Sequence, residues 1–116
     1  MQLVASVFVA LVAVLHFYFL YLEMFAWTTP RGRKVFNTTP EFAEASSRLA
    51  ANQGLYNGFL SAGLLYGLAM ANREFVVFFL GCVIVAGLYG AYSVNKRILF
   101  VQAVPAALAL GLTLLS

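Results

Sequence analysis

Long apolar stretches separated by short polar ones dominate the sequence. Four such stretches cover about residues 3–27, 41–71, 75–93 and 98–115. Each approaches or exceeds the roughly 20 residues that an α-helix needs to cross the hydrocarbon core of a bilayer. Only Asn72-Arg73-Glu74 separates the second stretch from the third. Connections this short join antiparallel neighbours, so the pattern predicts an all-α membrane protein, a four-transmembrane-helix antiparallel bundle in one domain, residues 1–116.

The ends of these stretches carry recognisable helix signals. Thr38-Thr39-Pro40-Glu41 has a hydroxyl for a cap, a proline for the first helical position and an acid for the first turn. It therefore predicts a helix start near Pro40. Pro105 lies inside the last stretch and predicts a kink. We expect the first stretch to span the membrane and not to be a cleaved signal peptide, because no basic residue precedes its long apolar run.

Composition and charge point to the same class of protein. The chain is 63% hydrophobic and 9% charged, whereas soluble domains carry about a quarter charged residues. Most of the basic residues lie in the connections after the first and third stretches, as Arg31, Arg33, Lys34, Lys96 and Arg97. The opposite side has Arg73, offset by Glu74. The positive-inside rule then predicts that both basic connections are cytoplasmic and both termini outside. We expect the lipid bilayer, and no nucleic acid, as partner.

Polar side chains in or beside the apolar stretches are the candidate site. We expect them to converge in the half of the membrane next to the basic connections. They are Glu23, Arg48, Asn52, Tyr56, Tyr89, Tyr92, Arg97 and Gln102. Such groups are costly in a membrane unless they have partners, and we expect Glu23 to pair with Arg48. The cluster serves either to hold the helices together or to hold the polar head group of a ligand.

The remaining chemistry-bearing residues favour structural roles. His16 is the single histidine, and we expect it to bond to a neighbouring helix. Cys82 is the single cysteine and lies in an apolar run, so no intrachain disulfide is possible and a packing role is expected. No metal site is predicted. Small residues at Gly54, Gly58 and Ala62 allow close helix packing. A single bundle of four short helices encloses little volume, so we expect a homo-oligomer.

Several motifs resemble an uncharacterised bacterial family. They are His16, Glu23-Met-Phe-x-Trp27, the run Asn52-Gln-Gly-Leu-Tyr-Asn-Gly-Phe-Leu60, Gly81-Cys-Val-Ile-Val-Ala-Gly87 and Val101-Gln-x-x-Pro-Ala106. That family consists of small four-helix membrane proteins that carry a domain of unknown function. The resemblance implies this fold, a place in the bacterial cytoplasmic membrane, and no activity.

A second resemblance involves the start of the second stretch. Arg48 and Asn52 lie four residues apart behind a basic connection, which is similar to the MAPEG superfamily (membrane-associated proteins in eicosanoid and glutathione metabolism). Members are trimers that bind glutathione between subunits beside a lipophilic substrate. The resemblance implies a MAPEG-like trimer in which Arg48, Asn52 and Arg97 hold an anionic head group. Leu55 stands where that superfamily has a glutamate that helps to hold glutathione, so glutathione or another thiol cofactor would lack that contact here.

In the same resemblance, Tyr56, Tyr89 or Tyr92 would stabilise a thiolate or position the substrate. The leading hypothesis is therefore a membrane protein whose polar cytoplasmic-side cleft binds an amphipathic or lipophilic small molecule, with a thiol cofactor. One alternative is a small proton-linked transporter or ion-pathway protein that uses His16 and Glu23. Another is a structural or partner-binding membrane subunit. The sequence leaves open whether the protein is an enzyme.

Overall fold

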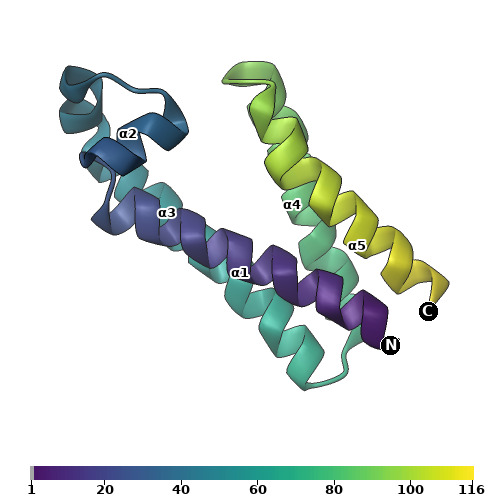
Figure 1. Ribbon diagram of the computed structural model, residues 1–116. Helices are drawn as coiled ribbons and strands as arrows, with labels where there is room; N and C mark the ends of the chain where they lie inside the picture. Colours follow the sequence, from purple (N-terminus) through teal and green to yellow (C-terminus); the bar gives the residue numbers. More distant parts are fainter. Residues whose placement is uncertain (1) are drawn as a thin grey trace. The chain divides into compact units, whose positions relative to one another are not determined.

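The protein is helical throughout the part that the structure describes. The computed structural model describes residues 2–116 and contains α1 (Leu3–Phe25), α2 (Pro30–Phe36), α3 (Pro40–Ala69), α4 (Arg73–Ser93), the π-helix η1 (Leu99–Ala103) and α5 (Val104–Leu115) (Figure 1). No strand occurs within these residues. The all-α prediction is confirmed, and the short helix α2 is an addition to it.

Two of these helices are long and apolar enough to cross a membrane, namely α1 and α4. The other two expected spans do not meet the same requirements. In α3 the amides of Asn52, Gln53 and Asn57 interrupt the apolar run, and the last helical stretch, Leu99–Leu115, is shorter. Four membrane-spanning helices therefore remain a prediction, whereas two apolar helices of sufficient length are observed.

Side-chain caps begin three of the helices. The Thr39 hydroxyl accepts a hydrogen bond from the Phe42 N–H (3.1 Å) at the start of α3, which begins at Pro40. Thr29 accepts from the Gly32 N–H (3.2 Å) in α2, and Asn72 accepts from the Phe75 N–H (3.1 Å) in α4. Each cap satisfies a backbone donor that has no partner within its own helix. Local sequence therefore determines where these helices begin.

The chain divides into two compact units, and the first comprises residues 2–14 and 60–116. Its core is apolar and receives side chains from four helices: Val9 from α1, Leu64 from α3, Leu80 from α4 and Ala106 from α5 are all fully buried. In this unit α4 and α5 run side by side (Figure 1). Dispersion and close packing, with few polar contacts, hold the unit together.

The last helical stretch begins with a π-helical turn that precedes Pro105. The Val104 N–H bonds to the Leu99 carbonyl, and Pro105 occupies the first turn of α5. A proline lacks the N–H that the interior of a helix requires, but the first turn of a helix does not need that donor. The observed irregularity before this proline is a π-helical turn, and the expected kink stays a prediction. Beside it, a Cβ on Gly87 would lie 2.7 Å from the backbone nitrogen of Ala103, so α4 approaches η1 closely.

The second unit, residues 15–59, contains the end of α1, α2 and the first part of α3. Here α1 and α3 approach closely at glycines. A Cβ on Gly54 would lie 2.7 Å from Cγ of Met24, and one on Gly58 would lie 2.7 Å from Cδ1 of Leu20. The Trp27 indole donates to the Ser46 hydroxyl (3.1 Å) and joins the end of α1 to α3.

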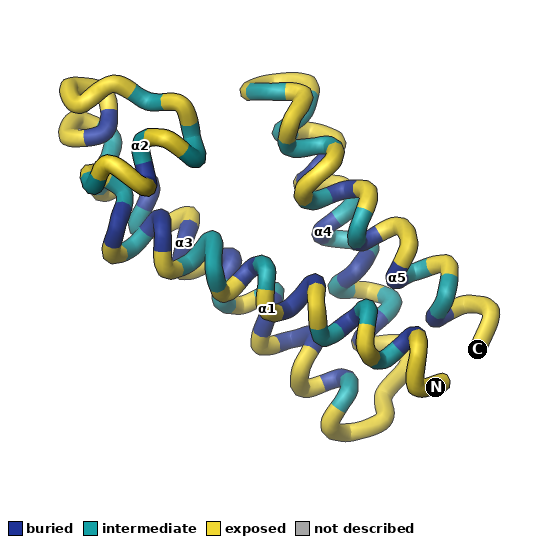
Figure 2. The backbone as a smooth tube through the Cα atoms, viewed as in Figure 1, coloured by how far each residue is buried: buried dark blue, intermediate teal, exposed yellow. Residues whose placement is uncertain are grey.

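Apolar side chains also cover much of the outer surface of the helices. Phe78 of α4 is 66% exposed, and Leu11 of α1 and Leu108 of α5 are more than half exposed. Figure 2 shows exposed positions along every helix of both units. Isolated exposed apolar residues are ordinary on soluble proteins, but long helices that are apolar on their outer faces are typical of lipid-facing surfaces.

Candidate functional site

A buried polar pair joins α1 to α3 in the second unit. The Asn57 side-chain amide donates a hydrogen bond to Oε1 of Glu23. Both residues are almost fully buried, with 7% of Glu23 and 6% of Asn57 exposed. Gly54, one turn before Asn57, lies against the Glu23 Cβ and makes this approach possible. We call Glu23 and Asn57 the α1–α3 clamp.

The clamp corrects one expectation from the sequence. Arg48 was expected to pair with Glu23, but the structure pairs Glu23 with Asn57 and leaves Arg48 exposed. Arg48 lies nine residues before Asn57 on the same helix, about 13.5 Å along the axis. An arginine side chain at that offset is too far along α3 to replace the amide. The rule that pairs opposite charges failed because helix register decides which side chains meet.

A second polar surface lies on α3, which we call the α3 outer face: Arg48, Asn52 and Tyr56. Successive members are four residues apart and so line one side of the helix. All three are exposed. Asn52 lies about 140° around the helix from Asn57, so the outer face points away from the clamp. Within residues 2–116 the side chains of Arg48 and Asn52 make no hydrogen bond or ion pair, and the Tyr56 ring contacts Phe59 edge-on (5.8 Å).

The other predicted site residues belong to the first unit. Tyr89 and Tyr92 lie near the end of α4 and are exposed, Arg97 lies in the turn after it and is also exposed, and Gln102 lies half-buried in η1. The predicted residues thus divide between the units, with Glu23, Arg48, Asn52 and Tyr56 in the second. A common site for both groups stays a prediction.

His16 and a tyrosine–arginine contact complete the polar features of the second unit. His16 is fully buried, and its ring meets Phe19 edge-on at 5.3 Å. The guanidinium group of Arg31 donates from Nε (2.9 Å) and Nη2 (2.6 Å) to the Tyr18 hydroxyl. Sequence reasoning missed this contact and did not choose Asn57 as the partner of Glu23. A signal for Asn57 was present, because it lies three residues after Gly54 and therefore on the closely packed side of α3.

Comparison with known proteins places the chain in a family. The family model described as "Protein of unknown function (DUF1304)" matches residues 10–114. The uncharacterized protein YpaA of Lactococcus lactis subsp. lactis is 39% identical over 114 residues, which cover 95% of this chain and 96% of that protein. No solved structure matches the chain significantly. The expected relationship to a bacterial family with a domain of unknown function is confirmed, the resemblance to the MAPEG superfamily stays a prediction, and the chain belongs to the DUF1304 family.

Proposed function

We propose that this chain is an integral membrane protein whose α3 outer face binds the anionic head group of an amphipathic, lipophilic ligand. The observation that carries the proposal is the exposed row Arg48, Asn52 and Tyr56, on a helix whose opposite side is closely packed against α1. A polar row that helix packing does not use is available for a ligand. The proposal includes a MAPEG-like assembly of several copies and a thiol cofactor.

The membrane location is supported by length, composition and exposure. Both α1 and α4 are long and apolar enough to span, and most of their residues are not buried within the protein. An apolar helix in a soluble protein would bury that surface in its core. If α1 and α4 contact lipid, the α3 outer face is an unusual polar row among apolar surfaces.

The chemistry of the α3 outer face suits a carboxylate or a phosphate. The Arg48 guanidinium can donate two parallel hydrogen bonds to such a group, the Asn52 amide can donate a third, and the Tyr56 hydroxyl can donate a fourth. Tyr56 and Phe59 add aromatic surface for an apolar tail. The clamp holds α3 against α1 from the other side and so fixes the orientation of this row.

Assembly into a homo-oligomer follows from the same exposure. Polar side chains that face lipid are unfavourable, and they gain partners when they face another protein surface or an aqueous cleft. A second copy packed beside α3 would supply that cleft. The superfamily resemblance implies that three copies do so.

A thermal-shift panel on detergent-purified protein tests the proposal. We expect glutathione conjugates with a long alkyl chain, or fatty-acid derivatives, to raise the unfolding midpoint of the wild type, and the rise to be lost in Arg48→Ala and Asn52→Ala. Absence of any response from the wild type, or equal responses from the variants, would refute the proposal. If alanine substitutions change the oligomeric state and no compound binds, a structural subunit is the better description.

The buried clamp favours a second candidate, a proton-linked transporter. Glu23 is a carboxyl group enclosed between two helices, and His16 lies on the same face of α1 seven residues earlier. Ionisable groups inside membrane helices commonly serve proton pathways. This candidate predicts pH-dependent flux in proteoliposomes that is lost in Glu23→Gln. Flux that is absent from the wild type, or unchanged in the variant, would exclude it.

A further inference from the structure

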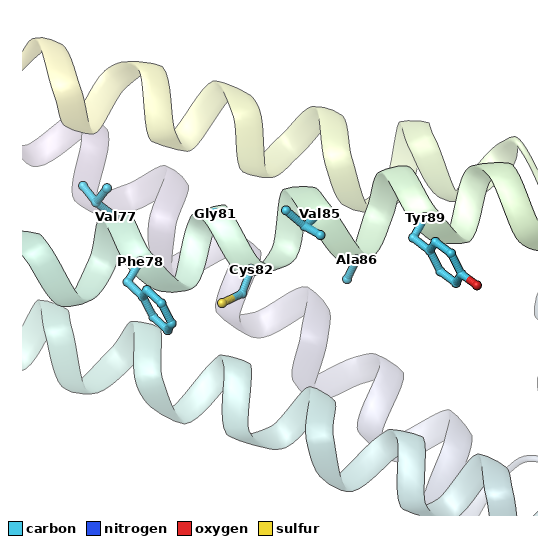
Figure 3. Close-up of a pocket in the computed structure, with 7 residues that line it drawn as sticks. All are labelled: Val77, Phe78, Gly81, Cys82, Val85, Ala86 and Tyr89. Carbon is cyan, nitrogen blue, oxygen red and sulfur yellow. The ribbon is translucent and has the colours of Figure 1, made fainter.

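An open groove runs along one side of α4 in the first unit. It has a volume of about 720 Å³ and is lined almost wholly by apolar atoms between Val77 and Tyr89. Phe78, Cys82 and Tyr89 point to the same side of α4 (Figure 3). Gly81 deepens the groove, since a Cβ added there would meet nothing within 4 Å. All of its lining residues belong to α4, so the groove is open on its outer side.

The length of the groove matches one leaflet of a bilayer. Val77 and Tyr89 are twelve residues apart, which corresponds to about 18 Å along a helix. One leaflet contributes about 15 Å of hydrocarbon. An acyl chain that follows α4 from the bilayer centre to the interface would therefore fill the groove. Tyr89 lies at one end of the groove, and tyrosines are common at that level of a bilayer, the membrane–water interface.

Charge distinguishes the two ends of the groove. Beyond Tyr89 lie Tyr92, which is 89% exposed, and then Lys96 and Arg97, both exposed. At the other end of α4 the Arg73 guanidinium already donates to the carbonyl groups of Thr113 and Leu114. Glu74 beside Arg73 balances the charge at that end, so net positive charge lies at the Tyr89 end.

We propose that this groove holds an acyl chain of an anionic phospholipid from the surrounding membrane, with the phosphate beside Lys96 and Arg97. Tyr89 and Tyr92 supply hydroxyl groups to the head-group region, and the two cations select negative charge. The site is separate from the α3 outer face. It rests on the part of the proposed function in which α4 spans a membrane.

Native mass spectrometry of the detergent-purified protein tests this site. The probes are phosphatidylglycerol and phosphatidylcholine with identical acyl chains, so that only head-group charge differs. We expect the wild type to retain about tenfold more phosphatidylglycerol, because each nearby cation favours an anionic head group. Lys96→Ala with Arg97→Ala should abolish this preference and leave phosphatidylcholine retention unchanged. Equal retention of the two lipids by the wild type would overturn the proposal.

A matched pair of glycine substitutions locates the acyl chain. Gly81→Leu fills the groove and should lower phosphatidylglycerol retention by about tenfold. Gly111→Leu adds the same side chain to α5, at a glycine that also has nothing within 4 Å, and should retain lipid as the wild type does. Wild-type retention by Gly81→Leu would contradict the proposal. So would a change in oligomer mass with unchanged lipid retention, because a second copy would then occupy the groove.

The outcome is separable from that of the proposed function. If alkaline extraction releases the protein from membranes, the membrane location fails and the groove has no lipid to hold. If the protein stays in the membrane fraction and responds to amphipathic ligands through Arg48, but Gly81→Leu retains lipid normally, the groove proposal alone fails.

Discussion

The two compact units differ in the side chains that meet between their helices. In the unit of residues 15–59, α1 and α3 approach through Gly54 and Gly58 and share the buried Glu23–Asn57 bond. In the other unit, apolar side chains from four helices form the core. Its polar ties between helices go to backbone carbonyl groups: Ser61 of α3 donates to Ala13 of α1, and Arg73 of α4 donates to the last carbonyl groups of α5.

This difference separates polar residues that hold the fold from those available for function. Glu23 and Asn57 are enclosed, and each satisfies the other. Arg48 and Asn52 stand on the opposite side of the same helix, where nothing within the described residues 2–116 engages their side chains. A helix that needed polar groups only for packing would carry them on its packed side. The α3 outer face is therefore the stronger functional candidate.

The largest effect should come from closing the glycine contact in the clamped unit. Gly54→Leu would drive a side chain into Met24, the Glu23 Cβ and the backbone oxygen of Leu20. The backbone oxygen cannot move aside. Overpacking typically costs about 1–3 kcal/mol and occasionally more, and the backbone contact puts this site at the upper end, so we expect a much lower unfolding midpoint in detergent micelles.

Gly111→Leu is the matched control for that substitution, because its added side chain enters open space. Its midpoint should stay near that of the wild type. Equal loss of stability in both variants would show that any large residue on a helix disturbs the protein, and the close contact between α1 and α3 would not be the cause.

A smaller effect is expected from breaking the clamp itself. Asn57→Ala leaves a buried carboxyl group without its hydrogen bond, which costs about 1–3 kcal/mol. Glu23→Gln preserves a hydrogen-bond acceptor and should cost less. Chemical denaturation in micelles would measure both, and an Asn57→Ala variant as stable as the wild type would rule out the clamp.

The smallest change in stability should follow Arg73→Ala. The guanidinium Nη2 lies 3.1 Å from the Leu114 oxygen and 3.3 Å from the Thr113 oxygen at an exposed helix end. Such a bond contributes about 1 kcal/mol. Lys96→Ala removes an exposed cation whose side chain makes no hydrogen bond within residues 2–116, and it serves as the control. If both substitutions lower the midpoint equally, the loss comes from net charge.

Much of the helical layout could be predicted from the sequence. Hydrophobic runs and caps act locally, so helix starts such as the one at Pro40 are visible in a few residues. The helix α2 was not predicted, because the seven residues that follow Thr29 form too short a pattern to recognise. The π-helical turn before Pro105 depends on how η1 packs against Gly87, which is tertiary information.

The candidate site was predictable only in part. Four-residue spacing was enough to place Arg48, Asn52 and Tyr56 on one side of α3. The predicted partner of Glu23 was wrong. The actual partner depends on the axial register between α1 and α3, and the close contacts at Gly54 and Gly58 fix that register. Opposite charge suggested Arg48, whereas geometry selected the nearer amide.

The most direct test of the account is saturation binding of S-decylglutathione, an anionic amphipathic probe, to detergent-purified protein. We predict saturable binding to the wild type and at least about tenfold weaker binding to the Arg48→Ala, Asn52→Ala double variant, since it loses hydrogen bonds to a charged group. Lys34→Ala removes an exposed cation of α2 in the same unit and should bind as the wild type does. Equal affinity in the double variant and the wild type, or equal weakening by Lys34→Ala, would contradict a ligand site on the α3 outer face.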